Sequence, residues 1–168
     1  MIDVNSVNIE FFIKARQATT IQKVSCGYLT VTLFSPEELD DAQIGYRASE
    51  TGEDLTGINE GDWNPNWLVI GHEDRCGDPI FVDVSRSTLP VFTAAHGQDR
   101  WDPELLAFSF SGFVLALNEV DRVCVNRRNP VELKRNPLSP GERETLLRQI
   151  AAMTETSNLE FWASWIQS

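Results

Sequence analysis

Apolar and polar positions alternate in three short runs near the middle of the chain, at residues 67–70, 80–84 and 89–94. Each run is rich in Val, Ile and Phe and is bounded by Gly, Pro or Asp, a pattern typical of β-strands. Leu68 and Ile70 share one face, and the later runs carry apolar side chains on both faces. We therefore expect a sheet covered by helices on one face and partly covered on the other. The connections are too short for parallel crossovers, so the strands should pair antiparallel.

Helical spacing of apolar residues predicts three helices elsewhere in the chain, at residues 5–17, 110–120 and 158–166. Helix-start motifs predict two more, at residues 36–46 and 140–153. In the helix at residues 5–17, Val7, Phe11 and Ala15 form the apolar stripe with Phe12 and Ile13 alongside, and Asn5 or Ser6 supplies the N-terminal cap.

Two Ser-Pro-x-Glu motifs mark helix starts, one at Ser35 and one at Ser139. Ser at the N-cap, Pro at the first helical position and Glu at the third form a capping box. The acidic residues after Ser35 suit the positive end of the helix dipole, so we interpret them first as structural. The helix at residues 110–120 should be capped by Ser109 or Ser111.

Two stretches lack a periodic pattern. Residues 48–66 are rich in Gly, Asp and Glu, which predicts an exposed loop. Trp63 in this loop either tucks under the sheet, the commoner outcome, or anchors a partner. Residues 123–140 are basic and contain prolines, which predicts an irregular segment. Residues 29–33, by contrast, alternate strictly and predict one more half-buried strand.

The length of 168 residues fits a single domain, residues 1–168, with room for a proper core. Together with the elements above, this predicts an α+β fold in which helices pack on a curved, mainly antiparallel sheet. No apolar run approaches the ~20 residues that cross a bilayer, and the first residues lack the features of a signal peptide. Cys26, Cys76 and Cys124 are far apart and odd in number, which favours free thiols and a cytoplasmic location.

Charge is uneven along the chain, whose formal net charge is −11 at pH 7. Residues 36–104 hold 16 acidic and 4 basic residues, whereas residues 122–148 hold 3 acidic and 7 basic ones. An acidic region repels nucleic acid and attracts a basic partner by long-range steering, so we expect a protein partner and no direct nucleic-acid binding. An acidic surface can also serve solubility alone. The basic segment should act as an internal counter-charge or contact an acidic helix.

Catalytic and metal-binding patterns are sparse. His72 and Cys76 have the spacing of two metal ligands, but the second Cys/His pair that a structural zinc site needs does not occur in the sequence. His96 with Asp99 or Asp102 could supply a general base and its orienting carboxylate, but no nucleophile motif accompanies them. No phosphate-binding or dinucleotide-binding loop occurs. We therefore expect no metal, no cofactor and no enzymatic activity.

An ordered set of motifs in the central stretch resembles the SUKH superfamily. The set comprises Trp67-Leu-Val-Ile-Gly, Gly77-Asp-Pro-Ile-Phe-Val-Asp83, Pro90-Val-Phe, His96-Gly, Trp101-x-Pro103 and Ala107-x-Ser-Phe110-x-x-Phe113. The resemblance covers about residues 63–117 and is loose in the flanks. It implies a curved sheet with packed helices in a protein that is not an enzyme. Members include bacterial immunity proteins, which bind and neutralise toxins that are often nucleases, and fungal regulators of cell-wall synthesis.

The favoured hypothesis is a bacterial immunity protein that neutralises a basic toxin domain, such as a nuclease, through its acidic surface. Candidate contact residues are Glu53, Asp54, Glu60, Asp62, Trp63, Glu73 and Asp74, with Trp63 as the buried anchor and the carboxylates as the steering rim. A second hypothesis is a regulatory or scaffold protein of the same fold that binds a cellular protein. A third is a hydrolase that uses His96. The sequence leaves the oligomeric state open.

Overall fold

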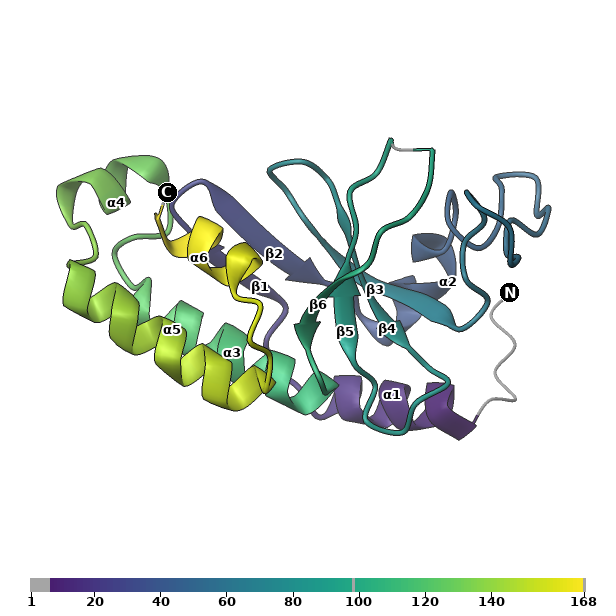
Figure 1. The fold of residues 1–168 in the computed structure, drawn as a ribbon, viewed down its shortest axis with the longest axis horizontal. Helices are drawn as coiled ribbons and strands as arrows, with labels where there is room; N and C mark the ends of the chain where they lie inside the picture. The colour runs from purple at the N-terminus through teal and green to yellow at the C-terminus, as the bar shows by residue number, and fades with distance from the viewer. Residues whose placement is uncertain (1–6, 98, 168) are drawn as a thin grey trace.

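A curled sheet forms the centre of the protein, whose computed structural model describes residues 7–97 and 99–167 apart from the side chains of Val7 and Asn8. In these residues six strands follow one another in sequence order, and each pairs antiparallel with the next (Figure 1). The strands are β1 (Lys23–Cys26), β2 (Leu29–Leu33), β3 (Trp67–Glu73), β4 (Pro79–Asp83), β5 (Val91–Thr93) and β6 (Glu104–Ala107). The predicted α+β fold with an antiparallel sheet is confirmed.

Helices flank this sheet. They are α1 (Val7–Gln17), the 3₁₀ turn η1 (Pro36–Glu38), α2 (Leu39–Ala42), α3 (Phe110–Val123), α4 (Pro130–Arg135), α5 (Pro140–Thr154) and α6 (Glu160–Gln167). The predicted cap of α3 is confirmed, because Ser109 Oγ accepts the Gly112 N–H (3.0 Å). At the start of α5 the predicted capping box is confirmed, and the Ser139 N–H that donates to the Glu142 carboxylate (2.7 Å) lowers the pKa of Glu142. None of the described helices has both the length and the apolar composition needed to cross a bilayer.

The two faces of the sheet carry different layers of the core. Leu68, Ile80 and Val91 belong to the larger apolar cluster, in which residues of α1, α3, α5 and α6 cover one face. Phe81 points to the opposite face and packs with Trp63, which belongs to the loop after α2. The alternation predicted for the three central strands is therefore confirmed, and so is a sheet covered by helices on one face and partly covered on the other.

The buried side of α1 differs from the predicted stripe at Phe11, which is exposed. Phe12, predicted to lie alongside the stripe, is fully buried together with Ile9, while Ala15 is partly buried against the core. Phe12 packs edge-on against the aromatic ring that begins α3, with 5.0 Å between the ring centroids. The helix carries two overlapping apolar stripes, and contact with α3 selects the one that contains Phe12. The predicted N-terminal cap lies outside the described residues.

The helix predicted for residues 36–46 is shorter than expected, since α2 ends at Ala42. The next side chain, Gln43, is buried against β3, where it donates to the Val69 carbonyl (2.8 Å) and accepts the Val69 N–H (3.0 Å). These bonds hold the chain against the sheet. Gly45, at a φ of 87°, then turns the backbone out of the helical path.

The prediction of an irregular segment at residues 123–140 is wrong where α4 forms. Asn129 caps this helix by accepting the Glu132 N–H (2.9 Å), and Pro130 is its first residue. The Asn-Pro-x-Glu sequence is thus a third version of the helix-start motif. The strands β1 and β6 were not predicted, because these four-residue strands at the two edges of the sheet are too short for a clear alternation.

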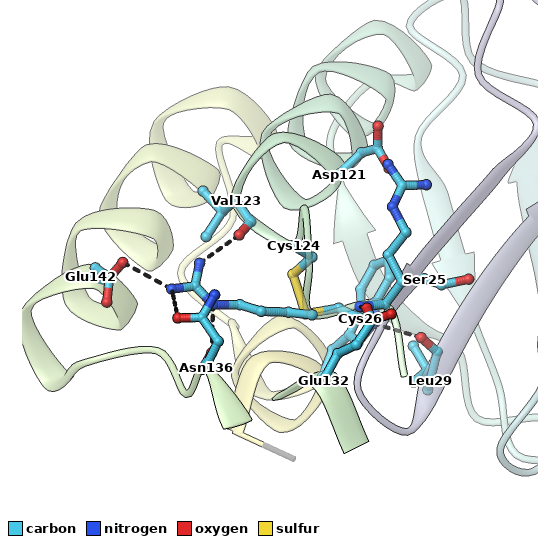
Figure 2. Close-up of a disulfide and its surroundings, with 12 residues drawn as sticks. Ser25, Cys26, Leu29, Asp121, Val123, Cys124, Glu132, Asn136 and Glu142 are labelled. Atoms are coloured by element: carbon cyan, nitrogen blue, oxygen red, sulfur yellow. Dashed lines mark hydrogen bonds and ion pairs between the residues drawn. A yellow bond between two sulfur atoms is a disulfide. The ribbon is translucent and has the colours of Figure 1, made fainter. Parts of the chain in front are cut away.

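A disulfide joins Cys26, at the end of β1, to Cys124, directly after α3 (Figure 2). It corrects the prediction of three free thiols, because Cys76 is the only free cysteine and all three lie within the described residues. The partners are 98 residues apart, so their spacing gave no sign of pairing. The Gly27 N–H also donates to the Arg127 carbonyl (2.8 Å), which fixes the β1–β2 turn against the end of α3. Since disulfides persist mainly in oxidising compartments, the argument for a cytoplasmic location from free thiols loses its basis.

Candidate functional site

A groove with a volume of about 480 Å³ lies beside α2 and the loop that follows it, and we call it the acidic groove. Its lining includes four carboxylates, those of Asp40, Asp41, Glu50 and Asp54, and the apolar side chain of Ile44. All five residues are exposed to solvent. The chain leaves its helical path after Ala42, and residues on both sides of this point line the groove.

Arg47 is the one basic residue in the lining of the acidic groove, and its guanidinium is turned into the protein. Its Nη1 donates to the carbonyl of Pro65 (2.7 Å) and to the carbonyl of Trp67 (2.9 Å). Burial lowers the pKa of Arg47, although the charge of Asp54 opposes this shift. The cation therefore serves to hold the loop against β3, and the solvent-facing charge of the groove is negative.

The loop at residues 48–66, which we call the acidic loop, is ordered by its own side chains. Asp54 Oδ1 accepts a backbone N–H two residues further on (2.8 Å), and this bond lowers the pKa of Asp54. Asp62 accepts both the backbone N–H and the side-chain amide of Asn59 (2.9 and 3.0 Å). Asp54 and Asp62 thus maintain the shape of the loop, while the predicted contact residues Glu53 and Glu60 are exposed on it.

Trp63 lies beneath the acidic loop and is only 1% exposed. Its ring packs against those of Trp67, Phe81 and Trp101, with centroids 4.9 to 5.3 Å apart. Its Nε1 donates to the Trp67 carbonyl (3.0 Å). The tucked alternative is therefore the one observed, and the prediction that Trp63 anchors a partner is wrong for this conformation. Its role is to fasten the loop to the second face of the sheet.

This region also exposes apolar residues that the sequence pattern did not single out. Ile58 is 96% exposed, and Ile44 and Leu55 are exposed as well. An isolated isoleucine in a polar loop gives little signal, because exposed apolar residues are common on protein surfaces. Ile58 differs in being almost wholly exposed on a hydrogen-bonded turn, where the Gly57 N–H donates to the Trp63 carbonyl (3.0 Å).

Glu73 and Asp74 lie apart from this loop in sequence, at the turn between β3 and β4, and both stabilise that turn. Glu73 is 4% exposed, and its carboxylate accepts the N–H groups of Arg75, Cys76 and Asp78 (2.8 to 3.1 Å). Asp74 accepts an N–H from β2 (2.6 Å). Glu73 is therefore removed from any contact surface, and the seven predicted contact residues fall into two groups on different loops.

One group of side chains has the spacing of metal ligands: Glu73, Cys76 and Asp78, whose ligand atoms all lie within 4.8 Å of one another. The Glu73 oxygens already accept three backbone N–H groups, which would compete with a cation. His72, the partner considered for Cys76, is not in this group, and its ring packs against Phe34 (5.5 Å between centroids). We therefore assign no metal to this turn.

His96 pairs with a different carboxylate from the two that the sequence suggested. Its Nδ1 lies 2.7 Å from Asp78 Oδ1, and its backbone N–H donates to the same oxygen (3.0 Å). Asp102 instead pairs with Arg100 (2.9 Å), and neither Asp102 nor Asp99 is the partner of His96. This double contact joins the β5–β6 connection to the start of β4. We therefore interpret His96 as a residue that stabilises the fold.

A second acidic cavity, of about 400 Å³, lies between the β3–β4 turn, β6 and α6 and includes Glu104. Burial raises the pKa of Glu104 and the charge of Glu160 adds to this, although a hydrogen bond from the Phe161 N–H opposes the shift. The folded protein therefore holds this proton more tightly than the unfolded chain does, so ionisation of Glu104 costs stability as the pH rises through its folded-state pKa.

Glu104→Gln should consequently make the protein more stable than the wild type at neutral pH. The gain should shrink as the pH falls below the ordinary pKa of a glutamate, because Glu104 of the wild type is then protonated and as neutral as the glutamine of the variant. Denaturant unfolding at neutral and acidic pH measures this difference. Glu144→Gln, at an exposed position on α5, is the matched control. An equal gain in both variants would mean that only the net charge matters.

Comparison of the chain with models of known protein families, with characterised proteins and with solved structures finds no match. The resemblance to the SUKH superfamily therefore stays a prediction from the motifs. What the described residues offer as a site is an ordered acidic loop and groove fastened to the sheet by Trp63 and Arg47.

Proposed function

We propose that the protein is a non-enzymatic binding protein, an immunity protein that neutralises a basic toxin domain through the acidic groove and the acidic loop. The observation that carries this proposal is the arrangement of charge around the groove. Its carboxylates are on exposed residues, while the guanidinium of Arg47 is turned inward to two backbone carbonyls. The motifs shared with the SUKH superfamily support toxin neutralisation as the purpose of this surface.

A nuclease is the toxin class that suits an acidic surface best. Its active site is basic because it binds phosphate, and carboxylates can occupy the same positions through charge-assisted hydrogen bonds. Long-range attraction between opposite charges also raises the rate of encounter, and this effect weakens as salt screens the charges.

Apolar contacts complement the charges. Ile44 lines the acidic groove among the carboxylates, so the aliphatic stem of a lysine or arginine can pack on it while the charged head reaches Asp41 or Glu50. Ile58 projects from the acidic loop and replaces Trp63 as the candidate anchor.

The double variant Asp41→Asn/Glu50→Gln should associate about tenfold more slowly with a basic toxin domain at low salt. The probe is the protein encoded by the neighbouring gene, and stopped-flow mixing at rising ionic strength gives the rate constant. The wild type should slow steeply with salt, and the variant less so. Glu144→Gln/Glu155→Gln, which removes two exposed charges near the two ends of α5, is the control for net charge.

Equal effects of the two double variants would show that the groove has no special role. A wild-type rate that does not change with ionic strength would remove the electrostatic argument altogether. Binding of a cellular protein that is not a toxin would instead support the regulatory or scaffold alternative. Loss of turnover on some substrate in His96→Ala, with unchanged unfolding, would support the hydrolase alternative.

A further inference from the structure

A second groove lies at the other end of the molecule, and we call it the basic groove. Its volume is about 210 Å³, and it is formed between α4, the β1–β2 turn and the end of α6. Tyr28, Leu133 and Ile166 give it an apolar lining, and Lys134 and Arg143 add positive charge. Lys134 and the large ring of Tyr28 are exposed, so both can contact a partner without rearrangement.

The walls of the basic groove are held in place by covalent and polar links. Figure 2 shows the disulfide that ties the end of β1 to the end of α3, directly beside the wall formed by the β1–β2 turn. Arg127 links the wall formed by α4 to the neighbouring helices. Its guanidinium donates to the carbonyls of Val123 on α3 and Asn136 directly after α4 (2.7 Å each), and it pairs with Glu142 on α5 (3.3 Å). A groove fixed in this way loses little conformational entropy when it is filled.

The segment that contributes α4 to the basic groove has a net positive charge, whereas the rest of the chain has a net negative charge. Residues 122–148 hold 7 basic and 3 acidic residues in a protein of net charge −11. An apolar groove with a positive rim favours an acidic segment that carries an exposed aliphatic side chain.

The acidic loop of the same protein has this chemistry. Ile58 is almost wholly exposed, and Asp54 and Glu60 near it are exposed carboxylates. The hydrogen bonds to Asp62 fix the turn that presents Ile58. Figure 1 places α4 and the loop after α2 at opposite ends of the long axis, so one molecule cannot bring its own loop to its own groove.

We propose that Ile58 of one molecule inserts into the basic groove of a second copy, so that the protein associates head to tail. The proposal does not depend on the toxin-binding function. A contact between two different surfaces of the same chain leaves a free loop and a free groove at the ends of every open product, so association should continue into chains unless they close into a ring. The small contact and the repulsion between molecules of like net charge should keep the association weak and dependent on concentration.

Sedimentation velocity of the full chain over a rising concentration series tests this. The average mass should increase with concentration in the wild type. Ile58→Ser, which removes the inserted side chain, and Lys134→Glu, which reverses the rim charge, should each weaken association at least about tenfold. Val131→Ser is the matched control, because it removes an exposed apolar side chain from α4 outside the groove and should associate like the wild type.

A mixture of the two defective variants gives the sharpest result. Ile58→Ser keeps an intact groove and Lys134→Glu keeps an intact loop, so their mixture should form dimers that grow no further. A wild type that stays monomeric at every concentration would overturn the proposal. It would also be overturned by loss of association in Val131→Ser alone, or by a mixture that behaves like its separate components. Unfolding curves for each variant confirm that the fold is retained.

Discussion

Removal of the disulfide by Cys26→Ala/Cys124→Ala should lower the free energy of unfolding by about 4 kcal/mol. The bond closes a loop of 98 residues, and a crosslink of that length restricts the unfolded chain strongly. It also joins the first hairpin of the sheet to the end of α3, two regions that are distant in sequence. Denaturant unfolding of the oxidised protein, the reduced protein and the double variant measures the effect.

Cys76→Ala is the control for this experiment, because Cys76 is exposed and free. Its unfolding should match the wild type within about 0.5 kcal/mol. Identical unfolding curves before and after addition of a reductant would mean that Cys26 and Cys124 are thiols. All three cysteines would then be free, as the sequence predicts, and a reducing compartment such as the cytoplasm would suit the protein.

Phe113→Ala should lower the free energy of unfolding by about 3–5 kcal/mol. Phe113 is fully buried on α3, and its ring packs against that of Trp162 on α6 (5.7 Å between centroids). Truncation removes apolar contacts and leaves a cavity between two helices that cannot move together, because each is also fixed to the sheet. Chemical denaturation followed by tryptophan fluorescence gives the value.

Leu115→Ala serves as the comparison on the same helix. Leu115 is 53% exposed, so its truncation should cost about 1 kcal/mol or less. A loss for Phe113→Ala no larger than that for Leu115→Ala would contradict the assignment of this face of α3 to the core.

Local patterns were sufficient to predict much of this fold. The alternation of β2 and of the three central strands, the Ser109 cap and the Ser-Pro-x-Glu starts depend on neighbouring residues alone, and all are confirmed. Features that depend on contacts between residues distant in sequence could not be predicted from local patterns. Pairing of Cys26 with Cys124 depends on how β1 meets α3, and the buried stripe of α1 depends on contact with Phe110.

The candidate site was predicted in outline and corrected in detail. Exposed carboxylates in the acidic loop follow from composition, because a segment with so many charges has little to bury. The burial of Trp63 follows from aromatic neighbours on the second face of the sheet. Glu73 resembles the other acidic residues in the sequence, and its burial becomes evident only from the three N–H groups that surround it.

Partner binding at the acidic end of the molecule can be tested by hydrogen–deuterium exchange of the complex. The protein would be bound to a basic toxin domain, the proposed partner, and exchange would be compared with that of the free chain. We expect slower exchange in residues 40–60 and unchanged exchange in α4 and α5. Protection of α4 and α5, with residues 40–60 exchanging as in the free protein, would contradict it.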